Sequence, residues 1–240
     1  MAALNIGTSG WHYRHWLGPF YPDHMDSADM LSHYCRYFTT VEINNSFYRL
    51  PSEETLADWR RTVPKTFCFS VKASRYLTHM KKLKDFHRPL QTFLYRVGVL
   101  ENRLGPVLFQ LPPRWKFNPE RLQAFVAGLP SGFRFVFEFR DPSWYDPRAF
   151  EILAERNMAL CIHDMAGSVS PKAVTGDFIY VRFHGPQKYG GHYDTQTLSG
   201  WAGAFSTWKR QGKTIFCYFN NDAQGHAVRN ALALKRMLEP

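Results

Sequence analysis

Residues 133–140, with the sequence Phe-Arg-Phe-Val-Phe-Glu-Phe-Arg, alternate aromatic side chains with charged or smaller ones. Successive side chains of a β-strand point to opposite faces, so the phenylalanines share one face while Glu138 and Arg140 lie on the other. Large aromatic rings suit packing against covering helices, whereas a charged face needs pairing or solvent. The segment therefore predicts a strand of a barrel whose interior opens into a polar mouth.

Seven other short apolar runs resemble this segment, and longer amphipathic stretches separate most of them. The expected strands are 4–8, 40–43, 67–72, 106–110, 133–139, 159–163, 178–184 and 214–220. The expected helices are 26–37, 53–62, 85–102, 119–128, 147–157, 197–210 and 223–238. Strands that alternate with helices through a whole chain predict a parallel sheet, and eight strands are the number in an α/β TIM-type (β/α)8 barrel.

The length of 240 residues suits one barrel domain over residues 1–240. Residues 164–176 are too rich in glycine, serine and proline for a regular helix, so a missing or short helix is expected between the sixth and seventh strands. An open, doubly wound sheet is the alternative architecture, because it is also built from alternating strands and helices.

Polar side chains follow the carboxyl end of every expected strand. In a parallel barrel these ends lie on one face, which carries the active site of barrel enzymes. The candidate catalytic residues at these ends are Glu42, Lys72, Glu138 and His163. The candidate substrate-binding residues are Trp11, Asn44, Gln110, Arg140, Arg182, His184, Asn220 and Asp222.

These residue types suit proton transfer and anion binding. A glutamate in such a site can serve as a general acid or base, and an enclosed lysine with a lowered pKa can act as a base or nucleophile. Two alternatives remain open for the glutamates, because Glu42 with Lys72, or Glu138 with Arg182, could form buried structural ion pairs. Neither a metal nor a cofactor is expected, since the cations in this set would repel a metal ion and attract an anion.

The charge of the chain also favours an anionic partner. Its formal net charge is +10, and residues 72–103 alone contain eight basic and two acidic residues. Such a cluster attracts phosphate groups, whether on a small phosphorylated ligand or on a nucleic acid. The sequence shows neither a secretory signal at its start nor an apolar run long enough to span a membrane. We therefore expect a cytoplasmic protein with no membrane partner.

Several motifs together resemble the YecE-like family, also catalogued as domain of unknown function seventy-two. They are Thr8-Ser9-Gly10-Trp11, Val41-Glu42-Ile43-Asn44-Asn45-Ser46-Phe47-Tyr48, Phe69-Ser70-Val71-Lys72, Gln110-Leu111-Pro112-Pro113, Glu138-Phe139-Arg140-Asp141-Pro142-Ser143-Trp144, Arg182-Phe183-His184-Gly185 and Phe219-Asn220-Asn221-Asp222. The resemblance runs nearly end to end and implies a TIM-type barrel. Nucleic-acid binding or cleavage, by analogy with a barrel endonuclease, is one activity that it suggests. This chain departs from that analogy because it lacks the dense His, Asp and Glu set of a three-metal endonuclease.

Two functional hypotheses follow from the sequence. The first is a hydrolase-like enzyme that acts on an anionic ligand, either phosphate-bearing or a nucleotide or sugar compound, at the carboxyl-terminal mouth of the barrel. The second is a non-catalytic nucleic-acid-binding protein that uses the same basic mouth.

Overall fold

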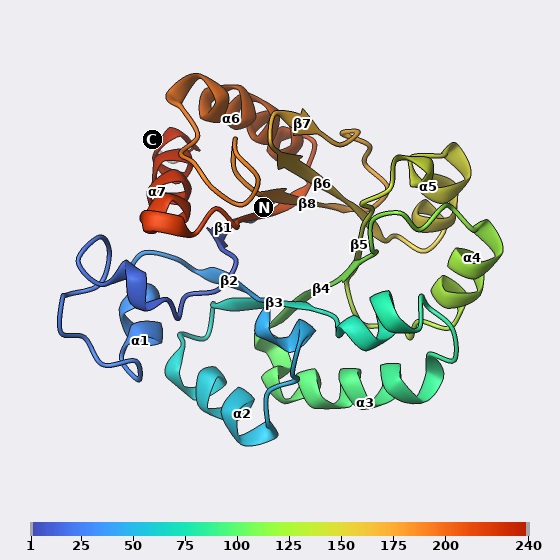
Figure 1. The fold of residues 1–240 in the computed structure, drawn as a ribbon, viewed down its shortest axis with the longest axis horizontal. Coiled ribbons are helices and arrows are strands. Elements are labelled where there is room, and N and C mark those ends of the chain that lie inside the picture. The colour runs from blue at the N-terminus through green and yellow to red at the C-terminus, as the bar shows by residue number, and fades with distance from the viewer. Residues whose placement is uncertain (1, 239–240) are drawn as a thin grey trace.

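The computed structural model describes residues 2–238, and within them the eight expected parallel strands are present (Figure 1). Each strand begins and ends within two residues of its predicted bounds. The parallel strands are β1 (Leu4–Thr8), β2 (Thr40–Ile43), β3 (Cys68–Lys72), β4 (Leu104–Gln110), β5 (Phe135–Glu138), β6 (Ala159–Met165), β8 (Phe178–Phe183) and β9 (Thr214–Phe219). An additional short strand, β7 (Ser168–Val169), pairs antiparallel with β6.

The sheet curls into a nearly closed barrel. Its strands are hydrogen-bonded in the order β1, β9, β8, β6, β5, β4, β3, β2, so closure requires β1 to meet β2. A bridge between Ser9 and Glu42 joins them at their carboxyl ends, where the Gly10 amide donates to the Glu42 carbonyl at 2.8 Å. Gly7 permits a close approach nearby, because a Cβ there would lie 2.2 Å from the Thr40 carbonyl oxygen. The structure is thus a TIM-type barrel and not the open sheet considered as the alternative.

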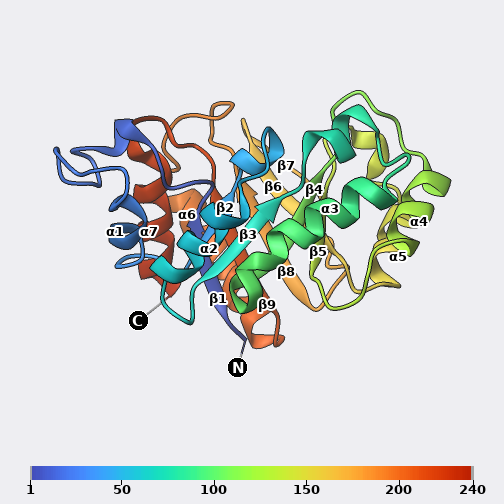
Figure 2. The ribbon, with the colours of Figure 1, turned by 90° about the horizontal axis from the view of Figure 1, so that it is seen from below.

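Helices surround the barrel on the outside, and α2 and α3 cover β2 and β3 in both views (Figures 1 and 2). The helices are α1 (Met30–Tyr34), α2 (Glu53–Thr62), α3 (His87–Val97), α4 (Pro119–Ala127), α5 (Pro147–Ala154), α6 (Thr195–Arg210) and α7 (His226–Leu238). Between β6 and β8 the described chain forms the β7 hairpin instead of a helix, which confirms the interruption predicted there.

Sequence signals fix the starts of α4 and α5. Each helix begins with proline, whose missing N–H costs nothing in the first turn. The preceding Asn118 side chain accepts a hydrogen bond from the Arg121 amide at 2.7 Å. Asp146 accepts one from the Arg148 amide at 2.9 Å. These caps satisfy backbone donors that lack intrahelical partners.

Three predicted helices differ most from the observed ones. The helix expected at 85–102 is α-helical only in α3, and the following 3-10 segment, Gly98–Arg103, is interrupted at Glu101. The helix expected at 26–37 is reduced to α1, because residues 27–29 form a turn before it. The helix expected at 223–238 is interrupted at Gln224, whose φ of 55° is left-handed, so a 3-10 turn precedes α7. No helix within residues 2–238 is both long enough and apolar enough to cross a membrane.

The two faces of the strands form separate packing layers. The outward-facing side chains, including Phe135 and Phe137, belong to the large core between barrel and helices. The inward-facing apolar side chains form a second cluster composed of Leu108, Val136, Ala159, Cys161, Phe178, Tyr180, Phe216 and Tyr218. This alternation confirms the pattern seen in residues 133–140 and directs the charged side chains toward the carboxyl-terminal mouth.

Candidate functional site

A buried network of charged side chains closes the base of the mouth. Arg182, at the end of β8, donates from one terminal nitrogen to Glu42 Oε1 at 2.8 Å. Its other terminal nitrogen donates to Glu138 Oε2 at 2.6 Å. The side chains of both glutamates are fully buried, and that of Arg182 is 1% exposed. The structure therefore joins three strands through one guanidinium.

The pairing differs in part from the ion pairs considered from sequence. The Glu138–Arg182 pair is present, whereas Glu42 pairs with Arg182 and not with Lys72. Hydroxyl groups complete the surroundings of Glu42: Ser9 Oγ donates to Oε1 at 2.8 Å and Tyr180 donates to Oε2 at 2.6 Å. Both Glu42 oxygens are thus satisfied, as a buried carboxylate requires.

The second oxygen of Glu138 faces two further strand-end residues. Oε1 forms an ion pair with Arg140 and lies 3.4 Å from His184 Nε2. Burial by itself would raise the pKa of Glu138, but Arg140, Arg182 and His184 hold it well below its usual value. Glu138 is therefore ionised throughout the physiological range.

His184 is a neutral ring in this network. Burial and the charge of Arg182 lower its pKa to about 3. Its Nε2 lies 2.8 Å from a terminal nitrogen of Arg140, which has hydrogens only to donate, so Nε2 is the acceptor. The second ring nitrogen, Nδ1, lies 3.1 Å from the side-chain nitrogen of Asn220.

Lys72 occupies the mouth at the end of β3. Its amine lies 4.2 Å from the centroid of the Phe47 ring and makes no ion pair or hydrogen bond with a residue of the described chain. Burial and the positive charge of Arg182 lower the pKa of Lys72 from 10.5 to about 7, although Glu138 and Glu42 act in the opposite direction. The amine therefore titrates near neutral pH and not in the ordinary range of lysine.

The remaining candidate residues occupy different parts of the carboxyl-terminal face. His163 is 8% exposed, and its Nδ1 has no hydrogen-bond partner among the described residues. Asn44 Oδ1 lies 3.5 Å from Arg182, and Gln110 is half-buried beside Glu138 in the neighbouring strand. Asp222 does not cap the last helix through its side chain; it lies 3.4 Å from His15 in the neighbouring loop.

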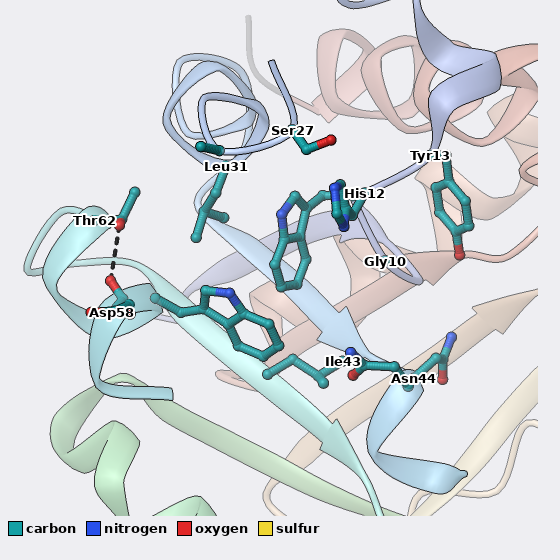
Figure 3. Close-up of a pocket in the computed structure, with 13 residues that line it drawn as sticks. Gly10, His12, Tyr13, Ser27, Leu31, Ile43, Asn44, Asp58 and Thr62 are labelled. Atoms are coloured by element: carbon teal, nitrogen blue, oxygen red, sulfur yellow. Dashed lines mark hydrogen bonds between the residues drawn. The ribbon is translucent and has the colours of Figure 1, made fainter. Parts of the chain in front are cut away.

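Trp11 lies apart from the charged network, in a cavity of about 490 Å³ beside the mouth (Figure 3). The cavity is lined by Gly10, Trp11, His12, Tyr13, Ser27, Ala28, Leu31, Ile43, Asn44, Asn45, Asp58, Trp59 and Thr62. Asn44 and Tyr13 lie toward one side of this cavity, while Asp58 and Thr62 lie toward the other.

Sequence reasoning did not identify Trp59, Asp58 or Tyr180 as site residues. Trp59 and Asp58 lie on α2, and only the folded chain brings that helix against the segment that contains Trp11. A signal for Tyr180 existed, because it shares the inward face of its strand with Arg182. Within the described residues, no cluster of three or more His, Cys, Asp or Glu side chains has a metal-binding arrangement.

The parallel barrel, with its buried network of charged side chains at the carboxyl-terminal mouth, places the chain in the class of TIM-type barrel proteins. A family sequence profile described as "Protein of unknown function DUF72" matches residues 5–240. The chain therefore belongs to the DUF72 family, which confirms the YecE-like resemblance.

Individual relatives cover nearly the whole chain. The UPF0759 protein YunF of Bacillus subtilis (strain 168) is 28% identical over 98% of this chain and 94% of its own length. A DUF72 family protein from Thermotoga maritima MSB8 is also 28% identical, with a TM-score of 0.90 over 99% of this chain and 100% of that one. A DUF72 family protein from Enterococcus faecalis V583, 22% identical with a TM-score of 0.81, covers 100% of this chain and 99% of that one, and shares the fold.

Proposed function

We propose that the mouth of the barrel binds a small anionic, phosphate-bearing ligand, and that the protein is a hydrolase-like enzyme in which Lys72 exchanges a proton with that ligand. The placement of Lys72 carries the proposal. Glu42 and Glu138 balance the charges of Arg182 and Arg140, so the network below the mouth is neutral as a unit. Protonated Lys72 adds a positive charge that no carboxylate of the described chain neutralises by direct pairing.

The lowered pKa gives Lys72 two useful forms near neutral pH. The protonated amine attracts an anion, and the neutral amine has a free lone pair that can accept a proton or attack an electrophilic atom. An amine with a pKa near the working pH performs proton transfer better than one at the ordinary value for lysine. A bound anion would in turn raise the pKa of Lys72, because it favours the charged form.

The other predicted residues take supporting roles in this proposal. Glu42 and Glu138 fix the guanidiniums of Arg182 and Arg140, and their full burial favours the structural alternative that the sequence left open for them. His163 is the second candidate for proton transfer, because its Nδ1 is unpartnered within the described chain. Arg140 and Asn220 border His184 at the mouth and would contribute donors to a bound anion.

Phosphate binding tests this proposal directly. We expect the Lys72→Met variant to bind inorganic phosphate about tenfold or more weakly than wild type, because one charge-assisted contact is lost. The matched control is Lys84→Met, which removes an exposed charge from the same basic segment and should leave the affinity nearly unchanged. Calorimetric titration of both variants would measure the difference, and equal affinities for Lys72→Met and wild type would contradict the proposal.

The nucleic-acid-binding alternative would use the same basic mouth together with the exposed cations that follow the strand ends. Lys82 and Lys84 follow β3, and Arg114 and Lys116 follow β4; all four are exposed. A nucleic acid that contacted these four residues would bind with a strong salt dependence, and Lys84→Met would lower its affinity. Binding of a small anion in the mouth should not respond to Lys84→Met, so the response to that variant separates the two functions.

A further inference from the structure

We propose that the cavity beside the mouth is a subsite for the sugar ring of the ligand. The inference rests on the proposed function in one respect, since the anionic group of the same ligand would occupy the mouth. The cavity volume of about 490 Å³ lies within the range of small-molecule sites. None of the residues that line the cavity is a lysine or arginine, so the cavity itself suits an uncharged group.

Two indole rings give the cavity its apolar surface. Trp11 and Trp59 meet edge to face, with centroids 4.8 Å apart and an interplanar angle of 85°. Leu31 and Ile43 contribute aliphatic surface beside them. The apolar C–H face of a sugar ring can pack against such a surface, which is the usual role of aromatic side chains in small-ligand sites.

The indole N–H groups of these two residues lack partners. Neither Trp11 nor Trp59 donates a side-chain hydrogen bond within the described residues. Trp16 provides the contrast, because its indole donates to the Asp222 carbonyl at 2.9 Å. Trp11 is only 7% exposed, yet its indole nitrogen is not one of the buried, unpartnered side-chain atoms of the described residues, so this N–H reaches accessible space. Two donors at the cavity therefore remain available to a ligand.

Polar side chains surround the apolar surface on several sides. Asn44 lies at the side nearer the strand ends, Asp58 lies at the opposite side, and Ser27 and His12 lie between them (Figure 3). Amide, carboxylate, hydroxyl and imidazole groups together supply both donors and acceptors. A sugar ring carries hydroxyl groups around its whole perimeter and can use partners on all sides. A nucleobase has hydrogen-bonding groups only in its plane.

Asn44 connects the cavity to the mouth. Its side chain lines the cavity, and its Oδ1 lies 3.5 Å from Arg182. Tyr13 lines the same side and donates to the Ser9 carbonyl at 2.7 Å, next to the hydroxyl that holds Glu42. A ligand whose ring packs against the indoles would therefore have its anionic group directed toward Arg182 and the mouth. The substrate class that fits both parts is a phosphorylated sugar.

A blocked cavity provides the test. Ala28 is exposed at the edge of the cavity, so Ala28→Trp would fill the space without altering the mouth. We expect wild type to bind D-ribose-5-phosphate or D-glucose-6-phosphate about tenfold or more tightly than inorganic phosphate, from added hydrogen bonds and ring contact. Ala28→Trp should remove this advantage and keep the phosphate affinity. The control, Ala124→Trp, adds the same ring at an exposed position on α4 and should change neither affinity.

A second variant tests the polar part of the cavity. Asp58→Ala removes an exposed carboxylate. It should lower the affinity for the sugar phosphates and leave the affinity for inorganic phosphate unchanged. Three results would overturn the subsite proposal. The first is that wild type binds neither sugar phosphate more tightly than inorganic phosphate, and the second is that Ala28→Trp lowers the affinity for all three ligands equally. The third is that the cavity binds adenosine in preference to D-ribose and D-glucose. Binding of a free sugar that Ala28→Trp abolishes, without any phosphate binding, would support the subsite and contradict the anionic mouth.

Discussion

Replacing Arg182 with methionine is expected to lower the free energy of unfolding at neutral pH by about 3–5 kcal/mol, the usual cost of removing one partner from a buried ion pair. Within the described residues, Arg182 is the only group that forms ion pairs with both Glu42 and Glu138. Its loss leaves two buried carboxylates with one guanidinium, that of Arg140. Urea denaturation of wild type and Arg182→Met would measure the loss.

The pH dependence of this loss has a definite sign. In wild type the pKa of Glu138 lies well below its usual value. Ionised Glu138 therefore stabilises the folded protein at every pH above the usual pKa of glutamate. This contribution declines as the pH falls toward the lowered pKa. Without Arg182, burial raises the carboxyl pKa, and protonation on acidification relieves the unpaired charge. The stability difference between Arg182→Met and wild type should therefore shrink as the pH is lowered from neutrality.

Two further variants show whether charge imbalance causes the loss. Glu42→Gln combined with Arg182→Met leaves Glu138 and Arg140 as a balanced pair and should recover a large part of the stability. Arg148→Met removes an arginine whose side chain is 64% exposed and paired with Asp146, and should change the stability little. A loss in Arg182→Met no larger than that in Arg148→Met, or no recovery in the double variant, would show that the network does not close the barrel.

Replacing Lys72 with methionine should have the opposite effect and raise the free energy of unfolding by about 0.5–2 kcal/mol below neutral pH, as substitutions at functional sites often do. The lowered pKa shows that burial and the charge of Arg182 outweigh the attraction of the glutamates for this amine. The cation–π contact with Phe47 is lost in the variant and offsets part of the gain. Methionine fills similar space without a charge that must be desolvated.

The stability gain should disappear at high pH. Between a pKa of about 7 in the folded state and the ordinary 10.5, the folded protein binds fewer protons at Lys72 than the unfolded chain does. Wild-type stability therefore rises with pH through this window, whereas the variant lacks that increase. Denaturation at about pH 6 and about pH 10 would measure the change, with Lys84→Met as the exposed control. A destabilised Lys72→Met variant at the lower pH would show that Lys72 holds the barrel together.

Local patterns were sufficient to predict the barrel. Alternation in residues 133–140 determined which side chains face the helices, and the caps Asn118 and Asp146 fixed two helix starts. The helices whose extent was predicted incorrectly differ for local reasons that the residue types did not reveal. Gln224 adopts a left-handed conformation that interrupts the last predicted helix, and a turn at residues 27–29 shortens the first.

The candidate site was predictable only in part. Strand parity and the position of strand ends placed Glu42, Glu138 and Arg182 on one face, but the choice of partner depends on the distances between strands. Sequence left Lys72 as a partner for Glu42, whereas the structure gives that place to Arg182. The cavity that Trp11 and Trp59 line depends on a contact between distant segments, which no local pattern predicts.

The protonation of Lys72 is the central claim about the mouth, and an NMR titration of its side-chain amine measures it most directly. Comparison with Lys72→Met assigns the signal. The structure predicts a midpoint near 7 and an upward shift when inorganic phosphate is added, because an anion stabilises the protonated amine. A midpoint near the ordinary 10.5, unchanged by phosphate, would contradict both the electrostatic description of the mouth and its proposed role in binding an anion.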